Sequence, residues 1–187
     1  MLLTKVHHRF TIDDYDRMID TGILTENDRV ELIRGEILDK MPIGDPDVAC
    51  VYRINRLLSK SAAADEAIVS VQSPIRLADS EPEPDIALIR MRDDFYASGK
   101  PRAADALLVV EVADSSLEFD RDVKGPMYAE AGIADYWIVN LAESRVEVYR
   151  QPRADGSFGQ IQFYTTGQQI DVAALTSLYI AVADILV

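Results

Sequence analysis

Two apolar, β-branched segments of the chain each contain a single carboxylate. Residues 106–112 read Ala-Leu-Leu-Val-Val-Glu-Val, and residues 84–89 read Pro-Asp-Ile-Ala-Leu-Ile. This composition predicts strands that are buried in a core. A charge beside a core strand loses its hydration, so it persists only with a partner or a metal ion. The fold must therefore place Asp85 and Glu111 where such a partner can reach them.

The composition indicates one globular domain over residues 1–187. Hydrophobic residues make up 48% of the chain, and the single cysteine, Cys50, excludes an internal disulfide and a cysteine-based zinc site. The net charge of −13 argues against non-specific adhesion to nucleic acid but leaves room for a local basic track. No apolar run reaches the roughly 18 residues that span a bilayer, and residues 1–10 lack a signal-peptide core. We therefore expect a cytoplasmic protein without membrane contact.

The N-terminal region predicts a helix and a hairpin. Thr11 and Asp14 resemble a capping box, which would open a short helix that ends near residue 20. Residues 30–33 and 36–38 have the pattern of two paired strands, and the residues between them are Arg34-Gly35.

Beyond the hairpin, we expect two further helices and a series of strands. Asp47 is a candidate N-cap for a helix to about Ala64, whose apolar positions have helical spacing at Val48, Val51, Tyr52 and Leu58. A later helix over residues 120–131 would end at Gly132. Strands are predicted over residues 67–72, 75–77, 85–91, 106–112, 136–140, 146–150 and 160–164. This order predicts an α/β fold, with α+β as the alternative, around a mixed central sheet.

The two strand carboxylates favour a site for a divalent cation. Magnesium binds through oxygen ligands, and it uses one or two protein carboxylates while keeping several waters. Asp85 and Glu111 on neighbouring strands would supply those two ligands. Lys124 would add an amine beside them, and Glu31, in the apolar strand of residues 30–33, is a candidate for a further ligand.

Each of these residues also has a structural interpretation. Asp85 would cap the start of its strand by accepting backbone N–H bonds, and Glu111 would form a buried salt bridge with Arg76 or Arg90. Lys124 would form a surface pair with Asp120, four residues earlier on the predicted helix. Glu31 would point to solvent through strand alternation.

Several enzyme classes are not supported by the sequence. It has no G-x-S-x-G elbow, no phosphate-binding G-x-x-x-x-G-K loop and no G-x-G-x-x-G segment. No histidine lies in the middle of the chain, which argues against a serine or cysteine hydrolase triad. A glycosidase-like carboxylate pair is the weakest of the alternatives.

The chain resembles the Uma-two family of restriction-endonuclease-like proteins, within the PD-(D/E)XK nuclease superfamily. The resemblance covers residues from about Phe10 to the end, and its specificity lies in the order of the motifs. They are Val-Glu-Leu-Ile-Arg-Gly-Glu-Ile at residues 30–37, Glu-Pro-Glu-Pro-Asp-Ile at 81–86, Leu-Val-Val-Glu-Val at 108–112, Asp120 through Lys124 to Tyr128, Ala-Glu-Ala-Gly-Ile at 129–133 and Tyr-Trp-Ile-Val at 136–139.

This resemblance implies a restriction-endonuclease-like core and a metal-dependent phosphodiesterase that acts on nucleic acid, DNA before RNA. The implied metal is Mg²⁺, with Mn²⁺ as a substitute. Asp85 and Glu111 match the family's acidic ligands, and the superfamily pattern adds the backbone carbonyl of Val112. The superfamily lysine two residues after the second acid is absent, since Ala113 stands there, and Lys124 matches a lysine moved to the following helix. Glu31 matches an acidic position grouped with this site.

Two departures from the family pattern leave a non-enzymatic alternative open. Asp47 stands where the family commonly has a histidine, and Gly125-Pro126 directly follows Lys124, where a proline kink would displace the amine. A catalytically degenerate nuclease fold would then act as a nucleic-acid or protein binding module. A homodimer is also expected, and a structural or regulatory dimer would use the apolar segment 175–187 as its interface.

Overall fold

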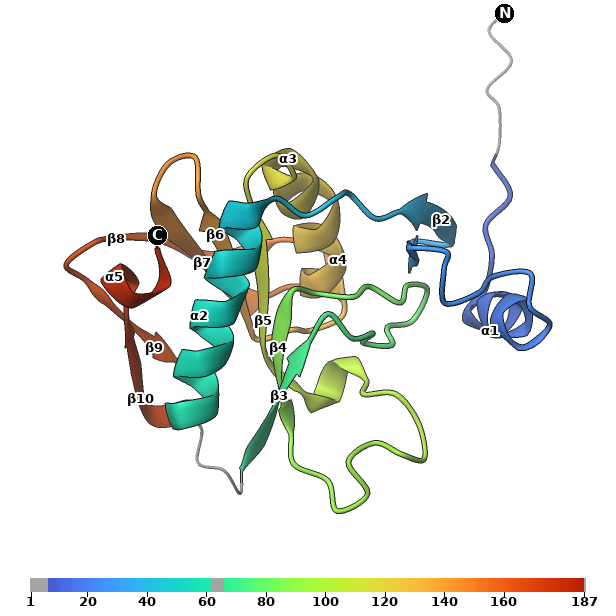
Figure 1. Ribbon diagram of the computed structural model, residues 1–187, viewed down its shortest axis with the longest axis horizontal. Coiled ribbons are helices and arrows are strands. Elements are labelled where there is room, and N and C mark those ends of the chain that lie inside the picture. The colour runs from blue at the N-terminus through green and yellow to red at the C-terminus, as the bar shows by residue number, and fades with distance from the viewer. Residues whose placement is uncertain (1–6, 62–65, 187) are drawn as a thin grey trace, which may run out of the picture.

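The computed structural model of the chain describes residues 7–61 and 66–186 and is built around one six-stranded sheet (Figure 1). The strand order is β3-β4-β5-β6-β7-β8, and every pairing is antiparallel except β5 with β6. The strands are β3 (Ala67–Val71), β4 (Ile86–Arg90), β5 (Ala106–Ala113), β6 (Asp135–Asn140), β7 (Arg145–Pro152) and β8 (Phe158–Thr165). The predicted mixed central sheet is confirmed.

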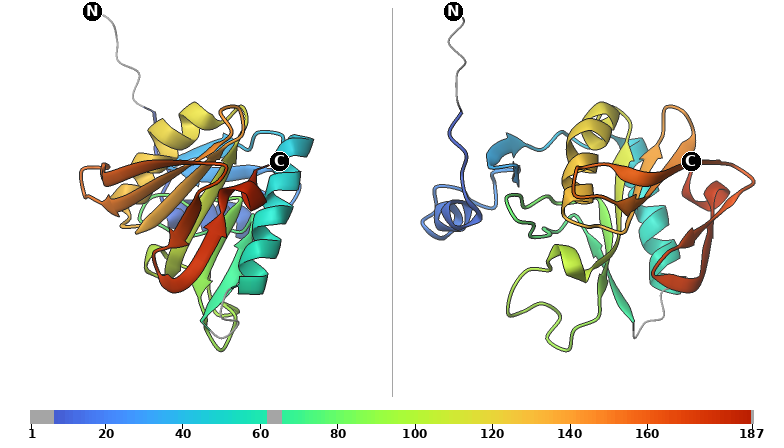
Figure 2. Two further views of the ribbon diagram at one scale, coloured as in Figure 1. Left: turned by 90° about the vertical axis from the view of Figure 1, so that its left-hand side faces the viewer. Right: turned by 180° about the vertical axis from the view of Figure 1, so that it is seen from behind.

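Both faces of this sheet are covered, which explains the apolar strand sequences (Figures 1 and 2). All eight residues of β5 are buried. Its side chains Leu108, Val110 and Val112 pack with α2 (Asp45–Ser61) and with the C-terminal β9 (Gln169–Val172), β10 (Leu175–Ala181) and α5 (Val182–Ile185). On the other face, Val109 and Ala113 pack with Met127 and Tyr128 of α4 (Gly125–Glu130). Glu111 is the charged exception on this second face.

The N-terminal predictions are confirmed. Helix α1 (Ile12–Asp20) begins with the Thr11 and Asp14 capping box, in which each side chain accepts the other residue's backbone N–H. Strands β1 (Val30–Ile33) and β2 (Glu36–Asp39) form a hairpin whose two turn residues have φ of +49° and +76°, the backbone that a two-residue type I′ turn requires. Leu32 bridges to Glu81, which joins this hairpin to the segment that precedes β4.

The predicted helix over residues 120–131 is present as three short helical pieces. These are α3 (Leu117–Phe119), a π-helical turn over Asp120–Lys124 and α4. In the π turn, the N–H of Gly125 donates to the carbonyl of Asp120, five residues earlier. Gly132 ends the helix at φ of +79°, as predicted.

The start of α2 differs from the prediction. The helix begins at Asp45, and Asp47 lies inside its first turn, where its carboxylate accepts the N–H of Gly44 at 3.0 Å. Tyr52 is 69% exposed, because Cys50 and Ile54 face the core in its place. The predicted end near Ala64 lies outside the described residues.

The second half of the chain also contains corrections. Residues 75–77 form no strand within the described chain, although Ile75 and Leu77 are buried and Arg76 makes an isolated bridge to Arg102. The strand predicted over residues 160–164 is not the last, because the β9–β10 hairpin and α5 follow it. The buried apolar residues of the segment 175–186 lie in the core against α2, so these side chains do not form a surface: Leu175, Leu178, Ile180, Val182, Ile185 and Leu186. None of the helices in the described part of the chain is long and apolar enough to cross a membrane.

Candidate metal and catalytic site

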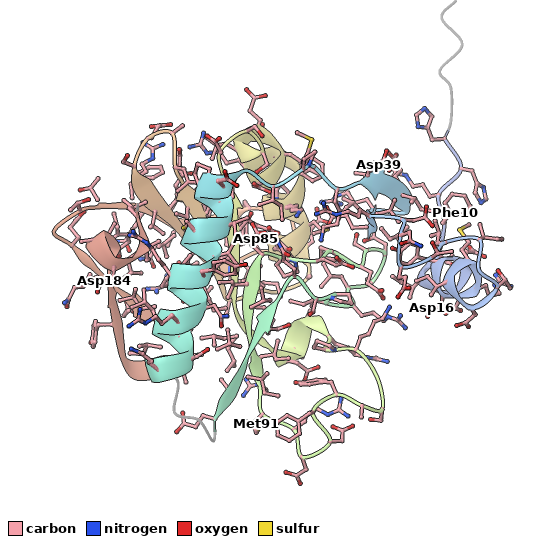
Figure 3. The ribbon with its side chains drawn as sticks, viewed as in Figure 1. Phe10, Asp16, Asp39, Asp85, Met91 and Asp184 are labelled. Carbon is pink, nitrogen blue, oxygen red and sulfur yellow. The ribbon has the colours of Figure 1, made fainter. Side chains whose placement is uncertain are left out.

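A cavity of about 410 Å³ lies where the end of β5, the start of α2 and the π turn meet the chain between β2 and α2. Asp85 marks this region at the centre of Figure 3. The cavity is rich in carboxylates, with eight acidic side chains against the amines of Lys40 and Lys124. The acidic residues are Glu31, Asp39, Asp47, Glu83, Asp85, Glu111, Asp114 and Asp120.

The sheet brings Asp85 and Glu111 to the same place. Ile86 pairs with Val110 in the antiparallel β4–β5 register, so Asp85, one residue before β4, lies opposite Glu111. Directly opposed residues project from the same face of a sheet. The N–H of Val112 donates to Oδ2 of Asp85 at 2.8 Å, which fixes this carboxylate against β5. The structural interpretation, a backbone N–H bond, is therefore correct for Asp85 and compatible with its place in the cavity.

Lys124 is buried against the same carboxylates. Its Nζ lies 3.0 Å from Oε1 of Glu111 and 3.5 Å from Oε1 of Glu31. The hydroxyl of Tyr128 donates to the same Glu111 oxygen at 2.9 Å. The expected surface pair of Lys124 with Asp120 is wrong, because both side chains are buried. Burial lowers the pKa of Lys124, but the neighbouring carboxylates, Glu111 first, raise it well above its ordinary value.

Glu31 contacts the site from the N-terminal hairpin. Its side chain is buried, which excludes the alternative that it points to solvent. One carboxylate oxygen faces Lys124, and the other accepts the backbone N–H of Glu83 at 3.1 Å. Glu31 therefore joins the lysine to the segment that leads into Asp85.

Asp120 is a member of the site that sequence reasoning placed on the surface. Its carboxylate accepts the hydroxyl of Ser116 at 2.6 Å and lines the cavity. Burial raises the pKa of Asp120 to about 6, although Lys124 and Ser116 act in the opposite direction. The four-residue spacing of Asp120 and Lys124 indicates that both lie on the same helix face. It does not reveal whether that face is buried.

The electrostatics of Glu111 show that the site lacks positive charge. Burial raises the pKa of Glu111 to about 8, and the charges of Asp120 and Asp85 act in the same direction. Lys124 is the main opposing influence, and it is shared among several carboxylates. An added cation would therefore stabilise the ionised form of Glu111.

The possible ligands in the cavity fit magnesium, which keeps several bound waters, better than a metal ion that is coordinated by protein atoms alone. Within residues 7–61 and 66–186, no three or more His, Cys, Asp and Glu side chains are grouped closely enough to enclose a metal. Asp85, Glu111 and Val112, the residues that the sequence nominates as ligands, all line the same cavity. Magnesium accepts one or two carboxylates and fills its other positions with water.

The π turn holds Lys124 in place despite the following proline. Tyr136 donates from its hydroxyl to the carbonyl of Asp120 at 3.0 Å, and Arg121 forms an ion pair with the buried Glu147. Pro126 lies in the first turn of α4, where its missing N–H costs little. The expected displacement of the amine is therefore not found, since Lys124 contacts Glu111 directly.

Comparison with known proteins agrees with this fold. A family model, Uma2, described as "Putative restriction endonuclease", matches residues 12–183. A crystal structure from Anabaena variabilis, described as that of "a putative nuclease belonging to DUF820", superposes with a TM-score of 0.72. Its sequence is 16% identical, and the match covers 94% of this chain and 97% of that one, which shows a shared fold. No curated protein gives a significant match. Because the family model covers nearly the whole chain, the protein belongs to the Uma2 family of restriction-endonuclease-like proteins.

Proposed function

We propose that the protein is a divalent-cation-dependent nuclease that hydrolyses phosphodiester bonds, with DNA as its first candidate substrate. The observation that carries this proposal is the convergence of Asp85, Glu111 and Lys124 on one cavity. Family membership and the fold of the nuclease-like neighbour support the same chemistry.

Asp85, Glu111 and the carbonyl of Val112 would hold Mg²⁺, with Mn²⁺ as a substitute. A bound divalent cation supplies a polarised phosphate and a water whose pKa is lowered. The charge of the cavity supports a requirement for the cation, because its carboxylates outnumber its amines and repel a phosphate. Among the described residues, the side chains of Lys124 and Tyr128 donate to the Oε1 atom of Glu111. The Oε2 atom is left for a further ligand.

The remaining residues orient the reacting groups. Lys124 would hold the attacking water or balance the negative charge that develops on the phosphate. Tyr128 and Glu31 fix the amine and the Glu111 carboxylate relative to each other. Asp120 adds a carboxylate at the cavity wall with a pKa near 6, which suits proton exchange close to neutral pH.

The direct test is cleavage of plasmid, linear duplex, single-stranded DNA and RNA by the purified protein, with and without Mg²⁺ or Mn²⁺. Asp85→Asn should abolish cation-dependent cleavage. Asp184→Asn is the matched control, because Asp184 is exposed on α5, away from Asp85 (Figure 3). Cleavage that persists in Asp85→Asn, or that needs no cation, would contradict the proposal.

A binding module remains the alternative that this test distinguishes. Asp47 lines the cavity where the family commonly has a histidine. If no substrate is cleaved, calorimetric titration with Mn²⁺ decides whether Asp85 and Glu111 still form a cation site. Absence of both cleavage and carboxylate-dependent cation binding would leave only the binding role.

A further inference from the structure

We propose that the free edge of β8 pairs with β8 of a second copy of the chain, so that two central sheets join across a twofold axis. Within residues 7–61 and 66–186, β8 is the last strand of the sheet and pairs on one side only, with β7 (Figure 2). A strand edge of this kind presents unpaired backbone N–H and C=O groups that can bind another strand.

β8 lacks the features that usually protect an edge strand. Proteins block free edges with charged side chains, prolines, bulges or short strands. β8 has eight residues, Phe-Gly-Gln-Ile-Gln-Phe-Tyr-Thr, with no proline and no charge. Its register with β7 is regular from Thr165 to Gln160.

The charge distribution favours a second copy as the partner. The chain has a net charge of −13, so two copies repel each other over most of their surfaces. Residues 156–170 contain no charged side chain. Two copies that meet along β8 therefore avoid direct contact between like charges.

The side chains of β8 are also self-complementary. Ile161 is 50% exposed and Phe163 is 53% exposed, and both project from the same face because they lie two residues apart. An antiparallel pairing centred on Gln162 places Ile161 of each copy opposite Phe163 of the other. This pairing gives two aliphatic–aromatic cross-strand contacts, which stabilise antiparallel sheets. Gln162 then faces Gln162 of the second copy.

A cysteine cross-link tests both the partner and the register. In Gln162→Cys, the two new thiols face each other at the twofold axis, within the Cα separation that a disulfide requires. Gln160→Cys is the matched control on the same strand face, because residue 160 would face Tyr164 of the second copy. Cys50 is fully buried and does not compete.

We expect mild oxidation of the full-length protein to give a covalent dimer with Gln162→Cys and little with Gln160→Cys on a non-reducing gel. Equal cross-linking of both variants would indicate random collision and would overturn the proposal. Stronger cross-linking of Gln160→Cys would overturn the register.

Sedimentation velocity measures the association without a cross-link. The wild-type protein should shift from monomer to dimer as its concentration rises, and Ile161→Glu should shift the transition to higher concentration by at least tenfold. Tyr179→Glu is the control, because Tyr179 is 62% exposed on β10, in the C-terminal segment. A monomer at every concentration, or dissociation by Tyr179→Glu alone, would refute pairing through β8.

Discussion

Two buried glutamates in one row across the sheet have opposite electrostatic environments. Glu111 on β5 pairs with Ile138 on β6, and Ile138 pairs with Glu147 on β7. Both glutamates therefore project from the same face, and both contact the same π turn, through Lys124 and Arg121 respectively. Nevertheless, the pKa of Glu111 is raised to about 8, while that of Glu147 is lowered to about 2.

The number of donors around each carboxylate explains this difference. Burial raises the pKa of Glu147, but hydrogen bonds from four side chains outweigh it, and these come from Arg121, Asn140, Tyr149 and Arg145. Glu111 has Lys124 and Tyr128, and it shares the lysine with Glu31 and Asp120. Glu147 has enough donors to stay ionised when buried, and it stabilises the fold. Glu111 has too few cations around it, so it can bind an additional cation.

The largest effect on activity is expected when Glu111, the proposed cation ligand, is replaced. Glu111→Gln should lower kcat/KM for Mg²⁺-dependent cleavage by at least about a hundredfold, because even residues that only support metal ligands cost 10–100-fold. Glu147→Gln in the same assay is the comparison, and the folded protein should lose much less activity, because Tyr136 still holds the π turn through the carbonyl of Asp120. Equal losses in both variants would show that the two glutamates do not have separate roles.

Removal of the shared amine should give the next largest effect on activity. Lys124→Met should reduce kcat by about a hundredfold, as expected when one group that stabilises developing charge is lost. Lys124→Arg keeps the charge and should recover part of the rate. A single-turnover assay with saturating Mg²⁺ measures this, and full activity of Lys124→Met would exclude a role for the amine.

The largest effect on the free energy of unfolding is expected when Glu147 is replaced. Glu147→Gln should lower the free energy of unfolding by roughly 1–3 kcal/mol at pH 7, because it removes the buried charged acceptor of the half-buried Arg121 and Arg145, which keep only Glu143 as an ion-pair partner within the described chain. The folded pKa of about 2 lies below the ordinary glutamate value of 4.5, so this stabilisation is complete above pH 4.5 and is lost as the pH falls toward 2. Urea unfolding over this pH range should show a steeper loss for the wild type than for Glu147→Gln. Parallel curves would contradict this assignment.

The smallest effects should come from the tyrosines that donate to the two glutamates. Tyr128→Phe removes one hydrogen bond to Glu111, and Tyr149→Phe removes one to Glu147. Each should cost about 1 kcal/mol of unfolding free energy. Only Tyr128→Phe should also slow cleavage, by several-fold, when kcat and thermal stability are measured on the same samples. Slower cleavage by Tyr149→Phe alone would assign the catalytic role to Glu147 and its partners instead.

Much of the fold could be predicted because its signals are local. The capping box at Thr11, the Arg34-Gly35 turn and the apolar run before Glu111 each depend on neighbouring residues. The β9–β10 hairpin was missed because β9 has only four residues and the pairing of β10 shifts its register between Leu175 and Tyr179. The cap of α2 was wrongly assigned to Asp47, because the helix begins two residues earlier, at Asp45, and Asp47 accepts the N–H of Gly44 from inside the first turn.

The candidate site was predicted only in part. Asp85 and Glu111 were found because a charge within an apolar strand is unusual in any fold. The burial of Asp120 could not be predicted, since it depends on the π turn, which Tyr136 and Glu147 hold from distant strands. Lys124 was found through family resemblance, and its contacts with both Glu111 and Glu31 required the folded chain.

The sequence by itself determined the strands of the central sheet, the Arg34-Gly35 hairpin turn and the presence of two carboxylates that require partners. The tertiary structure decided which partners they have, because strand register and helix packing bring together residues far apart in the chain. Glu111 and Glu147 illustrate this division, since both are glutamates within apolar strands and only the donors around them differ. Those donors come from the π turn and from neighbouring strands, and long-range packing sets their positions.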